Sequence, residues 1–484
     1  MKNIYPLVLI SFLLPGWLMS QDKQAAKFAK TITTKDLKDR LSVLAHDSLE
    51  GRDTGSKGQW IAASYIADHF QSIGLEAVVN TPSGLSYFQT FNLQQSTLNK
   101  VYLRRGEEQK KNLEDFLYYS RSETLGEEFI QLIYIDQIDK QHDYKNKFVV
   151  FSTEDKDWEK MVSELESYEP AGFVVINKDE EAFQFTLKRY SNYFNRPTIR
   201  KSFDNNGEKI LMVNTSIAQW MFELENSALS HGLQTQLIFN ADMLIEPLKT
   251  ANVLGYLKGL EKPDELIVVT SHYDHVGIMN GQIYNGADDD GSGTSTVMEI
   301  AEAFASAAEK GKGPKRSILF MCVTGEEKGL LGSEYYTENP IFPLEQTVTN
   351  LNIDMVGRVD PKYEEQGNPN YIYVIGSDKL SQELHDLHES INTNTEKLTL
   401  DYTYNDENDP NRFYYRSDHY NFAKNNIPII FYFNGTHADY HKPTDTIEKI
   451  QFDKMQKIAR LIYYTAWEIA NREGRITADK LEGK

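Results

Sequence analysis

The 484-residue sequence predicts an α/β fold: a three-layer αβα sandwich around a mostly parallel, mixed central sheet, with a smaller β-rich domain inserted into it. Two observations lead to this fold class. From about residue 252, continuous apolar runs alternate with amphipathic helical patterns, which is typical of strands buried on both faces by helices. Residues 95–245 interrupt that alternation. The helices predicted before them, at 35–74, are expected to pack on the later sheet instead of on residues 95–245.

The first helices are expected at 35–47 and 57–74. In the second, Ile66, Phe70 and Ile73 recur at i, i+4 and i+7, and Gly74 provides a stop. Later helices are expected at 293–310 and 452–473, and the apolar strands that accompany them at 251–259, 265–271, 317–323, 349–356, 371–376 and 427–433. Three further strands, "KFVVF", "GFVVI" and "ILMVN", lie in the interrupting region.

The predicted domain organisation is a signal peptide at 1–20, a first part of the main domain at 21–94, an insert at 95–245, and the rest of the main domain at 246–484. Residues 1–20 contain one Lys, an apolar run broken by Pro6 and Pro15, and the small residue Ser20 before polar sequence. We therefore expect export to the periplasm or the exterior; an uncleaved anchor is the alternative. No later segment approaches 18 unbroken apolar residues, so a soluble mature protein without a stable membrane span is expected.

Composition excludes two classes of partner. The formal net charge is −20 and is spread along the chain, whereas proteins that bind nucleic acids or anionic membranes typically carry clusters of Lys and Arg. The single cysteine, Cys322, lies in the apolar run "SILFMCV" and is interpreted as a small core residue instead of a nucleophile. The oligomeric state is left open.

Histidine, aspartate and glutamate residues follow the predicted strands or lie in the loops that flank them. They are His272, Asp274 and His275; Asp288, Asp289 and Asp290; Glu326 and Glu327; Asp354; and His437 and His441. Ligands of open α/β sheets bind beyond the carboxyl ends of the strands, where these residues would meet. So many carboxylates repel each other unless a cation neutralises them. Imidazoles and carboxylates without cysteine suit borderline divalent metals, Zn²⁺ first, and their number suits two ions that share a bridging carboxylate.

The chain resembles the co-catalytic dizinc exopeptidases of metallopeptidase family 28, the aminopeptidase and glutamate-carboxypeptidase-like enzymes. The matching segments occur in the family's order: "SHYDHVG", "NGADDDGSG", "TGEEKGLLGS", "NIDMVGR", "YRSDHYNF" and "DYHKPTDT". Residues 41–77 resemble the segment that opens such domains, and residues 143–178 resemble a protease-associated insert.

The resemblance implies a set of metal ligands. His272 and Asp354 would bind one zinc, Glu327 and His441 the other, and Asp289 would bridge them, because the family's bridging Asp lies two residues before the Gly of "GSG". His275 and His437 match no ligand position and are interpreted as ordinary polar residues.

Further roles come from the same resemblance. Glu326 would be the general base that takes a proton from a water shared by the two ions. Asp274 would hold His272 through its free ring nitrogen, and Asp445 could do the same for His441. Tyr440 would donate to the substrate carbonyl. The Ser417-Asp418-His419 run is interpreted as structural or substrate-lining, since triad members meet in space and not in a row.

The function expected is that of an exported zinc-dependent aminopeptidase acting on peptides. Three alternatives stay open. A carboxypeptidase or dipeptidase would need a basic pocket, to which Arg416 or Arg358 could contribute. A glutaminyl cyclase would hold one zinc. A binding protein on an inactive scaffold would have lost ligands, whereas all five positions and the base are filled here.

Overall fold

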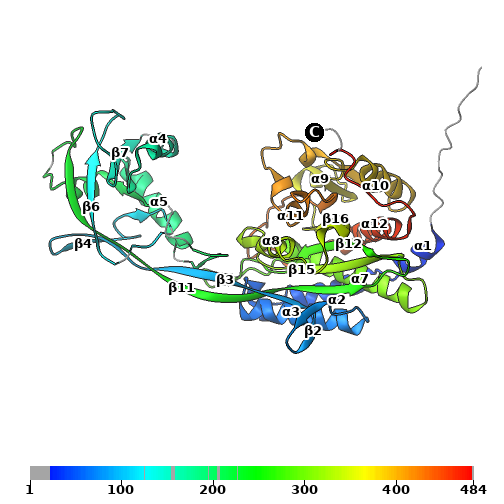
Figure 1. Ribbon diagram of the computed structural model, residues 1–484. Helices are drawn as coiled ribbons and strands as arrows, with labels where there is room; N and C mark the ends of the chain where they lie inside the picture. The colour runs from blue at the N-terminus through cyan, green and yellow to red at the C-terminus, as the bar shows by residue number, and fades with distance from the viewer. Residues whose placement is uncertain are drawn as a thin grey trace, which may run out of the picture. The chain divides into compact units, whose positions relative to one another are not determined.

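The computed structural model describes residues 22–120, 122–124, 126–153, 158–194, 196–203, 208–225 and 227–481 (Figure 1). The predicted signal peptide lies outside these residues. The chain divides into two compact units: unit 1 runs up to Phe91 and resumes at Thr250, and unit 2 spans Asn92–Lys249. The predicted boundaries, 94/95 and 245/246, lie within four residues of these positions.

Unit 1 is built on a mixed, mostly parallel sheet with the strand order β18-β17-β19-β16-β12-β15-β11. Its strands are β11 (Gln234–Leu257), β12 (Lys262–His272), β15 (Arg316–Val323), β16 (Thr347–Ile353), β17 (Tyr371–Ile375), β18 (Thr399–Asp401) and β19 (Ile429–Phe433). The central strands β15, β12, β16 and β19 are parallel to each other, while β11 and β17 run antiparallel to their inner neighbours. The predicted fold class is confirmed.

Helices cover both faces of this sheet. One face packs against α1 (Lys23–Ala29), α2 (Thr34–Leu44), α3 (Lys57–Ser72), α7 (Gly293–Glu309), α10 (Gln382–Asn394) and α12 (Phe452–Asn471). The other face packs against α8 (Leu331–Glu338) and α11 (His419–Ala423). Successive residues of β12 point to opposite faces, with Ile267 in the first core and Val268 in the second.

Local signals in the sequence explain where several of these helices begin. The Thr33 and Ser56 side chains accept hydrogen bonds from backbone N–H groups of the first turns of α2 and α3. Buried apolar residues then recur at helical spacing, as in Leu37, Leu41 and Leu44 of α2. Cys322 lies fully buried in β15, as predicted, and burial raises the pKa of its thiol to about 12.

Unit 2 contains the three predicted strands as the parallel strands β7 (Phe148–Thr153), β8 (Gly172–Asn177) and β10 (Ile210–Asn214), next to β6 (Glu128–Tyr134). It also contains α4 (Trp158–Leu165), α5 (Glu180–Phe194) and α6 (Thr215–Met221), which the prediction of a β-rich insert did not include. Parallel strands need crossover connections, and helices supply them here. Unit 2 is therefore itself an α/β unit with its own apolar clusters.

Two strands longer than expected cross the unit boundaries. They are β3 (Phe88–Arg105) and β11, which pairs with β6 over Gln234–Phe239 and with β15 over Val253–Leu257. Each strand continues through its boundary, although residues that are common in turns, Asn92 and Pro247, lie close to the two borders. Among the described residues, no helix combines the length and apolar character needed to cross a bilayer.

Candidate active site

The carboxyl ends of the parallel strands of unit 1 bring the predicted site residues together. His272 is the last residue of β12, Asp354 follows β16, and Glu326 and Glu327 lie three and four residues after β15. The loop that carries His441 follows β19. Because these strands are parallel neighbours, their carboxyl ends lie at one edge of the sheet, and the loop before α7 adds Asp289 there.

His272 faces three carboxylates. Its Nε2 lies 3.3 Å from Asp289 Oδ1, 3.6 Å from Asp354 Oδ1 and 3.9 Å from Glu326 Oε2. This nitrogen is buried and has no hydrogen-bond partner among the described residues. A buried nitrogen without a hydrogen bond is costly, and a divalent cation bound between this nitrogen and the carboxylate oxygens would satisfy it.

A second group of donors lies on the other side of Asp289. His441 Nε2 is 3.0 Å from Asp289 Oδ2 and 3.3 Å from Glu327 Oε2. Asp289 therefore presents one oxygen to His272 and the other to His441, which is the arrangement that a bridging carboxylate requires.

The structure separates Asp289 from the acids on either side of it. Asp288 Oδ1 accepts the Gly357 N–H at 2.6 Å, and Asp290 Oδ1 accepts the Met355 N–H at 3.0 Å. Both side chains therefore hold loops in place, and of the three only Asp289 lies between His272 and His441.

His275 lies much closer to this centre than the sequence interpretation placed it. It is fully buried, and its Nδ1 is 2.8 Å from Glu327 Oε1 and 3.8 Å from Asp289 Oδ2. Donor atoms that lie within 4.8 Å of one another form two groups: His272, Glu326 and Asp354, and His275, Asp289 and Glu327. Its position three residues after His272, at the end of the same strand, was the available signal. His437 is also buried, with Nε2 at 3.2 Å from Asp288 Oδ2, so both histidines lie buried against acids of the site instead of being ordinary polar residues.

Asp274 supports the site differently from the expectation. His272 Nδ1 lies 3.0 Å from the backbone oxygen of Asp274, whereas the Asp274 carboxylate is 3.9 Å away. That carboxylate instead accepts the Thr54 hydroxyl at 2.7 Å and the Glu326 N–H at 3.2 Å. The ring is thus oriented by a carbonyl, which serves a metal-binding histidine as well as a carboxylate does.

Asp445 also differs from its expected role. Its Oδ2 accepts the N–H groups of Asp288 and Asp289, at 3.0 and 3.2 Å, and thereby holds the loop that carries Asp289 instead of the ring of His441.

The Ser417-Asp418-His419 run forms no triad. Ser417 donates to Asp354 Oδ2 at 2.7 Å, Asp418 accepts from Ser333 at 2.5 Å, and His419 Nε2 contacts the Tyr414 carbonyl at 2.8 Å. Of the two expected roles, structural or substrate-lining, these contacts favour the structural one, with Ser417 orienting the carboxylate of Asp354.

Mutual repulsion shapes the ionisation of the site. Burial raises the pKa of Glu326 well above its ordinary value, and the charges of Asp354 and Glu327 add to the effect. Burial opposes protonation of His272, but the charges of Glu326 and Asp354 outweigh it and raise its pKa. A divalent cation would relieve this repulsion, and the nitrogen and oxygen donors present fit Zn²⁺.

Arg52 was not anticipated from the sequence, although it holds the site's loops together. Its side chain is fully buried and donates to the carbonyls of Tyr273, Asn285 and Gly286 at 2.8, 2.7 and 3.0 Å, and to that of Leu44. These carbonyls border the segments that carry His272 and Asp289, so one side chain ties the two segments to the end of α2.

A small pocket opens onto the donors. Its lining comprises His272, Asp289, Glu326, Asp354 and His441 together with Met355, Phe413, Arg416, Phe431, Phe433 and Tyr440. The Tyr440 ring stacks on His441 with 4.0 Å between centroids. The lining thus combines the histidine and carboxylate donors with apolar side chains and one arginine.

Comparison with known proteins agrees with this geometry. Residues 252–466 match the model of peptidase family M28. The chain is 29% identical over 237 residues to aminopeptidase YwaD of Bacillus subtilis (strain 168), a match that covers 46% of this chain and 45% of that protein. The matched segment therefore spans less than half the length of this curated relative.

Two solved structures share the fold. The aminopeptidase from Aneurinibacillus sp. strain AM-1 superposes with a TM-score of 0.59 at 18% identity, over 94% of this chain and 98% of that one. BSAP, a zinc aminopeptidase from Bacillus subtilis, superposes with a TM-score of 0.52 at 18% identity, over 92% of this chain and 98% of that one. The part of the chain that carries the candidate site, residues 252–466, therefore matches peptidase family M28, and the fold of the chain is that of the two aminopeptidase structures.

Proposed function

We propose that this protein is a zinc-dependent exopeptidase that removes N-terminal residues from peptides. The observation that carries the proposal is the position of Asp289, with one carboxylate oxygen facing His272 and the other facing His441. His272, Asp289 and Asp354 would hold one ion, and Asp289, Glu327 and His441 the other. The ions, when bound, would lower the pKa of water and polarise the peptide carbonyl.

Glu326 is the proposed general base, because it lines the pocket and is not one of the proposed metal ligands. It lies within 3.9 Å of His272 Nε2, and a raised pKa suits a group that takes a proton and then returns it. Its carboxylate would accept a proton from the attacking water. The same proton would pass to the leaving amine as the C–N bond breaks, so Glu326 ends the cycle in its starting state.

Substrate binding would use the rest of the pocket. Met355, Phe413, Phe431 and Phe433 offer an apolar surface for the side chain of the N-terminal residue. The carboxylates of the lining would attract its free α-ammonium group, and the Tyr440 hydroxyl would donate to the carbonyl being cleaved. We therefore expect a preference for apolar N-terminal residues.

A carboxypeptidase is the second candidate, because Arg416 also lines the pocket. The other candidate for a carboxylate pocket, Arg358, is engaged by Asp439 at 2.8 Å and lies 3.7 Å from Asp445. This leaves Arg416 alone to bind a terminal carboxylate and favours the aminopeptidase.

A substrate comparison tests the proposal. Leucyl-p-nitroanilide should be hydrolysed, N-acetyl-leucyl-p-nitroanilide should not, and a peptide with an amidated C-terminus should be cleaved as readily as its free acid. Chelation should abolish turnover and Zn²⁺ should restore it. Cleavage only of peptides with a free C-terminus, lost in Arg416→Ala, would favour the carboxypeptidase instead.

We also propose export, on the signal-peptide pattern of residues 1–20 alone. N-terminal sequencing of the protein recovered outside the cytoplasm should give a start close to Gln21.

A further inference from the structure

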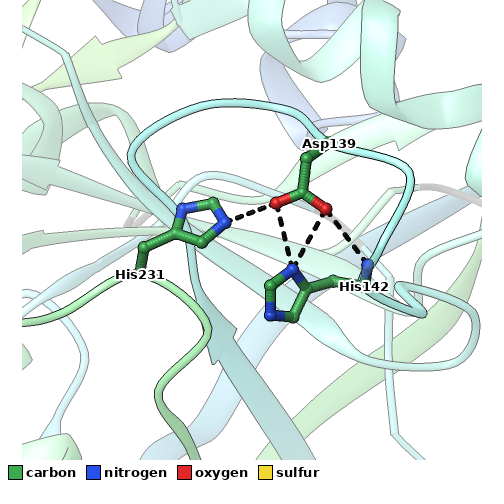
Figure 2. Close-up of side chains that lie close together, drawn as sticks. All are labelled: Asp139, His142 and His231. Atoms are coloured by element: carbon green, nitrogen blue, oxygen red, sulfur yellow. Dashed lines mark hydrogen bonds and ion pairs between the residues drawn. The ribbon is translucent and has the colours of Figure 1, made fainter.

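Unit 2 contains a second cluster of metal-type donors that the proposed peptidase chemistry does not use. Asp139 and His142 lie between β6 and β7, and His231 lies shortly before β11. Figure 2 shows the two imidazoles turned toward the same carboxylate. His142 Nδ1 is 3.0 Å from Asp139 Oδ2, and His231 Nε2 is 2.5 Å from the same oxygen.

The distances are close to those of a coordination site. In a tetrahedral zinc site with metal–ligand bonds of about 2.0–2.2 Å, neighbouring donor atoms lie roughly 3.3 Å apart. The donors of this cluster lie within 4.8 Å of one another, and each contact to Asp139 would need to lengthen by less than about 1 Å. Two imidazoles and a carboxylate, with solvent completing the shell, are ligands that suit Zn²⁺.

Asp136 gives His231 the outer partner that a metal-bound imidazole typically has. His231 Nδ1 lies 2.7 Å from Asp136 Oδ1, while the Asp136 N–H is farther from that nitrogen, at 3.3 Å. Both nitrogens of the His231 ring therefore face carboxylate oxygens. A neutral imidazole carries one N–H, so without a metal either the ring carries a second proton or one of the two contacts has no hydrogen between nitrogen and oxygen. A cation between Nε2 and Asp139 removes the conflict, because a neutral ring then donates from Nδ1 to Asp136.

The backbone holds the cluster in shape. Asp139 Oδ1 accepts the N–H groups of Gln141 and His142, at 2.7 and 3.1 Å, and the buried Tyr144 hydroxyl bonds both backbone groups of Asp139. On the other segment, the Gly232 N–H donates to the Tyr134 carbonyl at 2.9 Å.

Gly232 also leaves room for His142. Its φ is +77°, and a Cβ there would lie 2.5 Å from His142 Nε2. The absence of a side chain at Gly232 lets the His142 ring lie with its other nitrogen, Nδ1, toward Asp139.

We propose that Asp139, His142 and His231 form a zinc-binding site in unit 2, separate from the peptidase centre and structural in role. The three side chains are 23–27% exposed, so an ion can enter and water can complete its shell. The ion would join segments about ninety residues apart in sequence and stabilise unit 2 by closing that long loop.

Zinc stoichiometry on the full chain tests the site. After metal removal, Zn²⁺ loading and dialysis, the parent should retain one zinc more than His231→Ala. This difference does not depend on how many ions the peptidase centre holds, so it stands or falls separately from the proposed function. Asp143→Asn is the matched control, because Asp143 is a neighbouring acid that pairs with Lys147 outside the cluster, and it should keep the parent's stoichiometry.

Asp136→Asn gives a graded test. It keeps all three ligands and changes a side chain that is 62% exposed, so it should fold, and it should weaken the extra zinc about 10–100-fold without removing it. Equal zinc content in the parent and in folded His231→Ala would overturn the proposal.

A measurement on the parent alone covers the case in which the variant fails to fold. Zn²⁺, and not Mg²⁺, should protect His142 and His231 from diethylpyrocarbonate, as read by peptide mass spectrometry, while the exposed His46 stays reactive. Labelling of His142 and His231 that Zn²⁺ leaves unchanged would show a proton-linked ion pair in place of a metal site.

Discussion

At the residue scale, Glu326 and Glu327 are adjacent in sequence but differ in their surroundings. Glu326 faces His272 and Asp354 and has a raised pKa. Burial and Asp289 raise the pKa of Glu327, but the contacts with His275 and His441 outweigh them and hold it at about 2. The pair therefore contains one acid suited to proton transfer and one suited to permanent ionisation as a ligand.

Single amide substitutions should separate these roles. We expect Glu326→Gln to lower kcat by at least about 10²–10⁴-fold while both catalytic zinc ions are retained, because only proton transfer is lost. Glu327→Gln should lower the catalytic zinc content toward one. Metal analysis beside kinetics on leucyl-p-nitroanilide measures both, and full turnover in Glu326→Gln would remove it as the base.

Ser417 offers a test of the support around Asp354. Its hydroxyl donates to Asp354 Oδ2 at 2.7 Å. Ser417→Ala should weaken zinc binding at that position about 10–100-fold, and added Zn²⁺ should recover much of the activity. Ser333→Ala is the matched control, since this equally buried serine bonds Asp418 and no proposed ligand. Equal zinc affinity in the two variants would contradict the role assigned to Ser417.

At the element scale, the site depends on loops that follow strands and on the groups that join those loops. Gly51 and Arg52 illustrate this dependence. A Cβ at Gly51 would lie 2.4 Å from the Tyr284 carbonyl oxygen, so this close approach requires glycine. The next residue sends its guanidinium into the interior to bond four carbonyls.

Replacing Arg52 should therefore destabilise unit 1 strongly. Arg52→Met removes the guanidinium donor from four carbonyls, of which, within the described part of the chain, only that of Gly286 keeps a backbone donor, the Gly291 N–H. Each of the other three costs about 1–3 kcal/mol when its donor is lost, so we expect a loss of at least about 3 kcal/mol in the free energy of unfolding. Arg189→Met, on an exposed position of α5, should change it by less than about 0.5 kcal/mol. Urea unfolding followed by fluorescence measures the difference, and similar values for the two variants would contradict this role.

At the scale of the whole molecule, buried histidines should set the stability of unit 1 in acid. His388 of α10 is fully buried beside Thr465 of α12 and Tyr432 of β19. Burial, helped by His385, lowers its pKa from 6.5 to about 3. Below pH 6.5 the unfolded chain binds a proton that the native state does not, so stability falls as the pH drops toward 3.

We expect His388→Gln to reduce this pH dependence. The His388 contribution has a slope of at most about 1.4 kcal/mol per pH unit between pH 6.5 and 3, and it should disappear in the variant. Urea midpoints of the metal-free protein from pH 7 to 4 measure the slope. His46→Gln, at an exposed position, should keep the parent's slope, and an unchanged slope in His388→Gln would show that His388 does not contribute.

The predicted strands and helices of unit 1 were confirmed because their signals are local. The apolar run "SILFMCV" became β15, and the apolar spacing in 293–310 became α7. The lengths of β3 and β11, and the helices of unit 2, were missed. Residues common in turns, Asn92 in β3 and Pro247 in β11, lie within the long strands near the unit boundaries, and α5 lies within a polar segment whose buried residues, such as Phe183 and Leu187, are few.

The sequence by itself determined the fold class and the set of candidate ligands, because strand periodicity and the residues at strand ends are properties of contiguous segments. Tertiary structure decided which donors face each other. Only the folded chain brings His275 against Glu327 and assigns the orientation of His272 to a carbonyl, and it shows Asp289, which the resemblance had selected, facing both His272 and His441. It alone placed His231 beside His142, since distances between side chains far apart in sequence depend on the packing of the whole chain.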